Sequence, residues 1–345
     1  MTGEEVVAVP VQRDVVVIGA SAGGVEALRQ LVRVLPVNFP AAILVVMHLA
    51  PGGTSALPQI LGRAGELPAV AATHGRRLSA GVVHVAPPDR HLLLDDGVLF
   101  LSHGPTESGH RPAVNATFRS VAIAAGPAAV GVVLSGALDD GALGLRAIVD
   151  RGGAALVQDP AEALYPGMPE SALARTPTEH VYPVEVLGKV LDKLVRTPAP
   201  AAAVAQPSPA LLLEDRIARD GVRLDAVVPD DVTPPSGHSC PDCGGSLVEV
   251  GGRDGHYRCR IGHGWSAEAL LGAHDLEFER ALWTALRSLD EKTALARRMQ
   301  DNAGDRIGLL GRRYENTVRE CVAAAETLRR FLLAQDPGTG ADDDR

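Results

Sequence analysis

The stretch VVVIGASAGG, residues 15–24, decides the fold. Its β-branched beginning indicates a buried strand, its glycines permit a tight turn, and a helical pattern over Val25 to Leu35 follows. The same order recurs in Ile43 to Met47 and Ser55 to Arg63. Apolar runs without polar alternation are typical of parallel strands covered by helices on both faces. We therefore predict an α/β domain, built on a doubly wound and mostly parallel sheet, over residues 14–196.

Further elements of this domain follow from the same patterns. A hairpin is expected where Asp95-Asp96-Gly97 separates two apolar runs, Leu92 to Leu94 and Val98 to Leu101. Alternation then resumes, with predicted strands at Val130 to Leu134 and Ala154 to Val157, and predicted helices at Val114 to Ala125, Asp140 to Asp150 and Val184 to Val195.

Composition excludes several classes of protein. The chain has 345 residues, 46% of them hydrophobic, which is enough for two or three domains with real cores. A net charge of −9 argues against a protein that mainly binds nucleic acid. Apolar runs such as Ala41 to Met47 are far shorter than the ~20 residues that span a bilayer, and residues 1–13, an N-terminal extension, carry acids where a signal peptide is basic. We expect a cytoplasmic protein with no membrane insertion and no nucleic-acid partner.

Beyond residue 196 the sequence changes character. Residues 197–210, rich in Ala and Pro, are predicted to be a semi-rigid extended segment with neither a core nor a regular helix. Polar and Pro-containing sequence continues to about Ser236, so the linker is predicted over residues 197–236. A small Cys/His/Gly-rich module over 237–265, a hairpin of two amphipathic helices over 266–335 and a disordered tail over 336–345 follow. Apolar residues at helical spacing on either side of a turn at 301–304 support the hairpin: Phe278, Leu282, Leu286, Leu289 and Ala296, then Val318, Val322, Ala325, Leu328 and Leu332.

Three interpretations fit the turn Gly19-Ala20-Ser21-Ala22-Gly23-Gly24. A dinucleotide-binding loop is disfavoured because Ser21 replaces the middle glycine and His48, not an acid, ends the second strand. An α/β-hydrolase nucleophile elbow is disfavoured because several strands precede the serine in that fold. In the third interpretation, Ser21, His48 and Asp140 each follow a strand whose carboxyl end lies at one edge of the sheet. A nucleophile, a general base and an orienting acid would then meet there.

Each of these residues also has a simpler role open to it. Ser21 could cap the helix that follows it, and His48 could be a hydrogen-bonded scaffold residue. Asp139 and Asp140 could be the N-cap and first-turn acid of their own helix. Composition and spacing alone leave these alternatives open.

Six ordered blocks of the α/β domain resemble the catalytic domain of the chemotaxis protein-glutamate methylesterase family, CheB. The blocks are Val17 to Gly24, Val46 to His48, Val83 to Leu92, His110 to Asn115, Val133 to Gly141, and Gln158-Asp159 with Gly167 to Pro169. The resemblance implies that Ser21, His48 and Asp140 are a catalytic triad that needs no cofactor. It implies hydrolysis of glutamate methyl esters, with glutamine deamidation as a related activity, on a methylated chemoreceptor or related helical signalling receptor. Arg111 and Met168 would line the approach to the site.

The chain departs from the family pattern in three places. Ala22 stands where the family usually has threonine, and Gly136-Ala137-Leu138 where it usually has Gly-Met-Gly. Backbone N–H donors for an oxyanion hole remain, but a side-chain hydroxyl is lost. Residues 1–13 cannot fold into the phosphorylated receiver domain that family members commonly carry. We therefore expect a receiver-less enzyme that is controlled by its C-terminal modules or by a separate response regulator or kinase.

The Cys/His module has the spacing of a zinc ribbon. Three thiolates and one imidazole are supplied by Cys240, Cys243, Cys259 and His263, and we predict a closed, structural zinc site. His238 and His256 are less well placed alternates, and a redox CxxC would leave Cys259 and His263 unexplained. Cys321 is expected to pack on the apolar face of a helix. The module also resembles the cysteine-histidine segment that follows the methylesterase domain in some receiver-less members.

Two other functions compete with the methylesterase. The chain could be a catalytically weak scaffold that binds partners through the zinc ribbon and the helical hairpin, or an esterase of small molecules. Receptor bundles of this kind tend to be acidic, so docking of this acidic chain on them requires a local basic rim, for which the candidates are Arg76, Arg77, Arg90 and Arg111.

Overall fold

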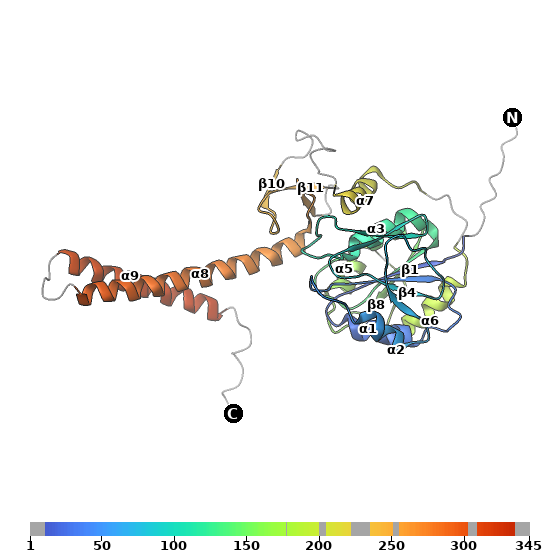
Figure 1. Ribbon diagram of the computed structural model, residues 1–345, viewed down its shortest axis with the longest axis horizontal. Helices are drawn as coiled ribbons and strands as arrows, with labels where there is room; N and C mark the ends of the chain where they lie inside the picture. The colour runs from blue at the N-terminus through green and yellow to red at the C-terminus, as the bar shows by residue number, and fades with distance from the viewer. Residues whose placement is uncertain are drawn as a thin grey trace, which may run out of the picture. The chain divides into compact units, whose positions relative to one another are not determined.

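The computed structural model describes residues 11–176, 178–199, 205–221, 235–250, 255–302 and 309–334 (Figure 1). It divides into two compact units, residues 1–270 and residues 271–345. The predictions made for residues 1–10, for residues 303–304 of the turn expected at 301–304 and for the tail 336–345 fall outside the described ranges. Residues 301 and 302 end a helix instead of forming part of that turn.

A seven-stranded, all-parallel sheet forms the centre of the first unit (Figure 1). Its spatial order is β3 (Ala69–Ala71), β4 (Val83–Val85), β2 (Ala42–Met47), β1 (Val15–Ala20), β7 (Ala129–Val133), β8 (Ala154–Gln158) and β9 (Val181–Tyr182). The predicted doubly wound α/β fold is confirmed. The strands β3, β4 and β9 have only two or three residues each, too few to show a pattern in the sequence.

Helices cover both faces of this sheet. One face carries α1 (Gly24–Arg33), α2 (Leu57–Ala64) and α6 (Val184–Val195). The other carries α3 (Val114–Ala125), α4 (Ala142–Asp150), α5 (Gly167–Arg175) and the predicted hairpin, β5 (His91–Asp95) with β6 (Val98–Ser102). Along β1, Val16 and Ile18 face the first layer while Val15 and Val17 face the second. Both faces are therefore apolar, which explains the unbroken hydrophobic runs.

The predicted linker contains a helix, α7 (Pro209–Asp220). Ser208 Oγ accepts the Leu211 N–H at 3.2 Å, Pro209 occupies the first helical position, and Gly221 ends the helix with a left-handed backbone, φ 63°. Ala218 is buried against the hairpin and α3. The predicted linker over 197–236 therefore contains a helix at residues 209–220, and the expectation of no regular helix over 197–210 is wrong for Pro209 and Ala210. The cap signals of this helix lie at the end of the Ala/Pro-rich stretch, and its stop signal lies beyond it.

The Cys/His module is a four-stranded antiparallel sheet within the first unit. Its order is β10 (Pro235–Ser239), β11 (Ser246–Val250), β12 (His256–Cys259) and β13 (Gly264–Ser266). An isolated parallel bridge between Glu107 and Gly264 joins this sheet to the α/β core. The module thus packs on the domain that precedes it in the chain.

The second unit is the predicted helical hairpin. It comprises most of α8 (Ala267–Asn302), which begins in the first unit, and α9 (Leu309–Ala334). A small apolar core joins the helices, and both Arg329–Asp290 contacts measure 2.7 Å. Cys321 is buried, as predicted. In the described part of the chain, no helix combines the length and the hydrophobicity needed to cross a bilayer.

Helices α3 and α4 exchange their N-terminal caps. The Asp140 carboxylate accepts the N–H groups of Val114 and Asn115, at 2.7 and 2.8 Å. In return, Asn115 Oδ1 accepts the N–H groups of Gly141 and Gly144, at 3.1 and 2.7 Å. This exchange fixes the loop that carries Asp140 against the start of α3.

We predict that Asn115→Ala lowers the free energy of unfolding by about 1–3 kcal/mol, because two buried N–H donors of α4 lose their acceptor. Urea titration of the full chain measures this loss. Asn38→Ala is the matched control: among the described residues the exposed Asn38 Oδ1 accepts from Arg196 alone, and the stability lost by this variant should stay within about 0.5 kcal/mol. Equal losses in the two variants would contradict the capping role.

Candidate active site

The three predicted catalytic side chains meet at the carboxyl edge of the sheet. Ser21 follows the central strand β1, His48 follows β2 on one side of it, and Asp140 lies in the loop after β7 on the other side. The main chain holds these loops together, since Ser21 N–H donates to Ser135 O at 2.9 Å. The strand order therefore brings residues 21, 48 and 140 to one point.

The side chains form a continuous chain of hydrogen bonds. Ser21 Oγ lies 3.0 Å from His48 Nδ1, and His48 Nε2 lies 2.7 Å from Asp140 Oδ2. The side chains of His48 and Asp140 are only 9% and 4% exposed, so little water competes for these bonds. Ser21 does not cap α1, whose N-cap is Gly23 without a side-chain hydrogen bond.

Asp140 is a buried carboxylate with three donors directed at it. Burial raises its pKa, but the hydrogen bond and charge of His48 and the two N–H groups of Asn115 and Val114 outweigh burial and bring the pKa down to about 2. The carboxylate is therefore ionised at neutral pH. As an acceptor it favours the His48 tautomer that carries its proton on Nε2, which leaves the Nδ1 lone pair facing Ser21.

The neighbouring acid, Asp139, has a different partner. Its Oδ1 accepts the Ser266 hydroxyl at 2.6 Å, and burial raises the pKa of its carboxyl. Neither acid caps the following helix α4 with its side chain: the N-cap residue is Gly141, and the side chain that accepts at this helix end is Asn115. Asp140 does cap a helix, as the simpler interpretation suggested, but the helix is α3 and not the α4 that follows it in the chain.

The loop after β7 passes close to Ser21. A Cβ at Gly136 would lie 2.0 Å from Met168 Sδ and 3.0 Å from Ser21 Cβ, so a side chain has no room there. Met168 is fully buried and packs against this loop. Leu138, where the family usually has glycine, has a left-handed backbone with φ 62°.

A cleft of about 440 Å³ opens beside His48. Arg111 lies in its wall, where its Nε and Nη2 donate to Asp89 Oδ1 at 2.9 and 2.6 Å. The Arg111 hydrogen bond is the main cause that lowers the pKa of Asp89. The full lining is His48, Leu49, Ala50, Pro51, Asp89, Thr106, Gly109, His110 and Arg111.

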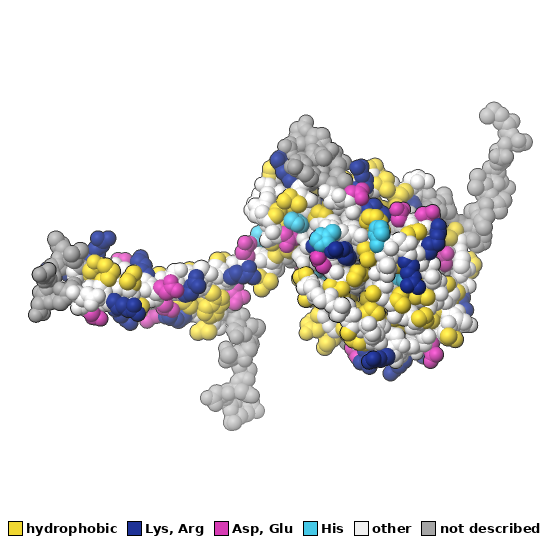
Figure 2. All heavy atoms as spheres, in the orientation of Figure 1, with side chains coloured by type: hydrophobic (Ala, Val, Ile, Leu, Met, Phe, Trp, Pro, Cys, Tyr) yellow, Lys and Arg dark blue, Asp and Glu magenta, His cyan; other side chains and the backbone are white. Residues whose placement is uncertain are grey.

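Basic side chains were predicted to form a rim for an acidic partner. Arg90 Nη1 contacts Asp89 Oδ2 at 3.4 Å, so Arg90 and Arg111 share one carboxylate, while Arg76 and Arg77 are exposed. On the face shown in Figure 2, basic, acidic and histidine side chains lie close together over the first unit. Half of the proposed rim is therefore partly neutralised by Asp89.

His110 is a site residue that spacing arguments missed. Its ring stacks on the His48 ring, with centroids 3.7 Å apart and planes 9° from parallel. Burial, followed by the neighbouring His48, lowers the pKa of His110 to about 4, so it stacks as a neutral imidazole at neutral pH. His110 comes from a turn outside the parallel strands, and the strand-end rule therefore does not find it.

The predicted zinc ligands also come together. The ligand atoms of Cys240, Cys243, Cys259 and His263 all lie within 4.8 Å of one another. Cys243 Sγ is 3.7 Å from Cys259 Sγ, and His263 Nδ1 is 3.7 and 3.5 Å from the sulfurs of Cys240 and Cys259. In a tetrahedral zinc site with ordinary bond lengths, two sulfur ligands lie about 3.8 Å apart and a sulfur and a nitrogen ligand about 3.6 Å apart, so this donor set fits zinc. The alternate His256 contacts Glu214 instead, at 3.2 Å.

Known proteins resemble the α/β domain that carries Ser21, His48 and Asp140. Residues 16–191 match the protein-family model described as CheB methylesterase. A protein-glutamate methylesterase/protein-glutamine glutaminase of Anaeromyxobacter dehalogenans is 43% identical over 183 residues, which cover 53% of this chain and 54% of that protein. A protein of the same name from Methanosarcina mazei is 36% identical over 192 residues, covering 53% and 52%. The chain spans about half the length of the curated relatives it matches.

A solved structure gives the same result. The crystal structure of the Thermotoga maritima CheB methylesterase catalytic domain is 32% identical and superimposes with a TM-score of 0.51. The match covers 54% of this chain and all of that one. The resemblance inferred from six sequence blocks is confirmed.

The pKa of Asp140 predicts a pH-dependent contribution to stability. Because folding lowers this pKa to about 2, the contribution is complete above the unfolded value of about 3.9 and is lost as the pH falls toward 2. The destabilisation caused by Asp140→Asn should therefore shrink by about 1 kcal/mol between pH 7 and pH 3. Urea titrations at the two pH values measure it.

Asp139→Asn is the control for this measurement. The pKa of Asp139 is raised by burial, so its ionised form destabilises the fold at neutral pH. The effect of Asp139→Asn should therefore become less favourable, not more, as the pH falls. Parallel trends in the two variants would contradict the environments described for these acids.

Proposed function

We propose that this chain, which belongs to the CheB methylesterase family, is a protein-glutamate methylesterase that also deamidates glutamine. The observation that carries the proposal is the hydrogen-bonded chain from Ser21 through His48 to Asp140, at 3.0 and 2.7 Å, within the family-matched region. A binding scaffold has no need of such a chain, so the geometry favours an enzyme. The names of the relatives, which pair methylesterase with glutaminase, support both reactions.

In the proposed reaction His48 is the general base. Its Nδ1 takes the Ser21 hydroxyl proton while Oγ attacks the ester carbonyl carbon. Asp140 remains ionised, holds the Nε2–H and stabilises the imidazolium. The tetrahedral intermediate collapses as His48 returns the proton to the leaving methoxide, and methanol departs.

Backbone amides at the start of α1 would hold the oxyanion. The Ala22 N–H directly follows the nucleophile and has no acceptor among the described residues. Water activated by His48 then attacks the acyl-enzyme and releases the glutamate, which regenerates Ser21. A glutamine side chain passes through the same kind of intermediate and leaves ammonia, which accounts for the second activity.

The substrate we propose is a methylated chemoreceptor or a related helical signalling receptor. The cleft beside His48 admits a side chain, and the exposed Arg76 and Arg77 offer positive charge to an acidic helix. Control by a separate response regulator or kinase belongs to the same proposal.

Incubation of the purified chain with a receptor that carries labelled methyl esters tests the activity. Ser21→Ala should lower methanol release by at least about 10³-fold, because the nucleophile is removed. Asp140→Asn should lower it by about 10³–10⁴-fold, because His48 is no longer held in the tautomer that accepts the Ser21 proton. Ser288→Ala, an exposed serine of α8, should release methanol like the wild type. Equal release by wild type and Ser21→Ala would refute the mechanism. Hydrolysis of simple esters with receptor methyl groups untouched would favour the small-molecule esterase.

We further propose that Cys240, Cys243, Cys259 and His263 hold a structural zinc ion. Four protein ligands leave no open position, so the metal would support the fold and take no part in ester hydrolysis. Gly244 has a left-handed backbone, φ 69°, which permits the tight turn after Cys243.

Metal analysis of the purified chain tests this second proposal, with one zinc per chain as the expected result. Cys243→Ser should lose the ion on dialysis, because one of four ligands is weakened. Cys321→Ser is the matched control: its thiol is buried in the helical hairpin, and zinc content should not change. A zinc-free wild type, or equal zinc in both variants, would overturn the assignment.

A further inference from the structure

One loop supplies a large part of the cleft wall. We call residues 105–111 the cleft segment; it contains the lining residues Thr106, Gly109, His110 and Arg111. Its tip is a two-residue turn, in which Glu107 and His110 exchange backbone hydrogen bonds of 3.1 and 2.9 Å. Both central residues have positive φ, 49° at Ser108 and 76° at Gly109, as a type I′ turn requires. The left-handed backbone at Ser108 is unfavourable for a non-glycine residue and needs support from its surroundings.

The Cys/His module provides part of that support through the backbone. Ser108 N–H donates to Gly264 O at 2.6 Å, and Gly264 N–H donates to Thr106 O at 3.0 Å. Thr106 Oγ1 donates to Asp242 Oδ2 at 2.6 Å, within the CxxC turn. The cleft segment is thus an extra strand-like neighbour of β13.

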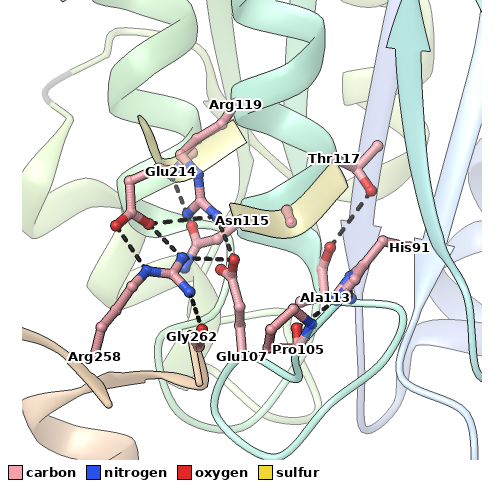
Figure 3. A network of polar contacts seen from close by, with 12 residues as sticks. His91, Pro105, Glu107, Ala113, Asn115, Thr117, Arg119, Glu214, Arg258 and Gly262 are labelled. Carbon is pink, nitrogen blue, oxygen red and sulfur yellow. Dashed lines mark hydrogen bonds and ion pairs between the residues drawn. The ribbon is translucent and has the colours of Figure 1, made fainter. Parts of the chain in front are cut away.

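A buried network of ion pairs also joins the Cys/His module to the cleft segment (Figure 3). Arg258 of β12 is fully buried; its Nη2 donates to Glu107 Oε1 at 2.8 Å and its Nε donates to Glu214 Oε1 at 2.7 Å. Arg119 of α3 also pairs with Glu107, and it lies 3.7 Å from Glu214 of α7. Two guanidinium groups and two carboxylates therefore join the module, α7, α3 and the cleft segment.

Charges at this depth depend strongly on one another. Burial raises the pKa of the Glu107 carboxyl, but the positive charges of Arg119 and Arg258 outweigh burial and bring it below its usual value. Removing one member leaves an uncompensated buried charge, which generally costs several kcal/mol. The network consequently locks Glu107, and with it the turn that follows, into one position.

A second contact joins the Cys/His module to the loop that carries Asp140. Ser266, the last residue of β13, donates its hydroxyl to Asp139, which directly precedes Asp140. The same oxygen accepts the Ala269 N–H at 3.1 Å and so caps α8. The module therefore contacts both loops that flank His48: the one with His110 and the one with Asp140.

We propose that Arg258 is a positioning residue of the active site. Through Glu107 it holds the cleft segment, and thereby the cleft wall and the His110 ring, against His48. Arg258 and Glu214 lie outside the family-matched residues 16–191, so this support comes from the C-terminal extension of the chain. The inference rests on the proposed function in that the cleft beside His48 is taken as the substrate site.

Two arginine variants of the full chain test the proposal. Arg258→Met removes one of the two positive charges that hold Glu107, the one contributed by the Cys/His module. Arg219→Met is the matched control, because Arg219 also joins α7 to the α/β core, through Asp95 and the Leu94 carbonyl, but does not touch the cleft segment. The readouts are amide hydrogen exchange over residues 105–111 and the rate at which a fluorophosphonate labels Ser21.

Both readouts are taken far below the unfolding temperature. For Arg258→Met we expect the amide hydrogen exchange rates of Ser108 and His110 to rise at least about tenfold. The rate at which the fluorophosphonate labels Ser21 should fall about three- to tenfold. Arg219→Met should stay within about twofold of wild type on both readouts. If Arg258 served only global stability, its loss would lower the unfolding temperature without changing labelling in the folded protein.

The proposal is overturned if folded Arg258→Met keeps wild-type exchange and labelling, or if both arginine variants change alike. If circular dichroism shows that Arg258→Met is unfolded, Thr106→Val is used in its place. This variant loses the hydrogen bond to Asp242, so amide exchange at Ser108 should rise about two- to fivefold. Unchanged exchange at Ser108 would then overturn the proposal. Labelling needs only a reactive Ser21. Absence of methyl-ester hydrolysis in the wild type would therefore refute the proposed function while leaving this test intact.

Discussion

The buried carboxylate of Asp140 is the constraint on which the rest of the active site depends. It accepts hydrogen bonds from His48, Val114 and Asn115, which belong to the end of β2 and the start of α3. A carboxylate so deeply buried is tolerated only when donors surround it, so these elements cannot move apart without exposing an unpaired charge. The interaction that orients the His48 ring therefore also holds the start of α3 against the sheet, and assembly of the site is part of folding.

The sequence was sufficient to predict the core sheet and the three residues at its edge. Long apolar runs identified β1, β2, β7 and β8, and the rule that parallel strands end at one edge brought Ser21, His48 and Asp140 together. Elements without a clear local pattern could not be predicted. The strands β3 and β9 are too short to show periodicity, and the Ala/Pro-rich composition of residues 197–210 concealed the start of α7.

Contacts between distant segments were beyond sequence reasoning for a different reason. Arg258 and Glu107 are 151 positions apart, and no periodicity relates a charge on β12 to a turn of the α/β domain. Likewise, the capping ability of Asp140 was evident from its residue type, but the helix it caps is set by packing. The contact between two side chains was predictable from the sequence where the order of the strands alone brings them together, as it does for Ser21 and His48.

The ion network also limits how this chain can change over generations. Loss of Glu107, Glu214 or Arg258 alone strands an opposite charge in the interior, so single replacements at these positions are strongly disfavoured. An apolar contact of similar volume could replace the network, but only if several of these residues changed together. The C-terminal extension and the α/β core are thus coupled through this network, so that a substitution of a network residue in one part requires a compensating substitution in the other.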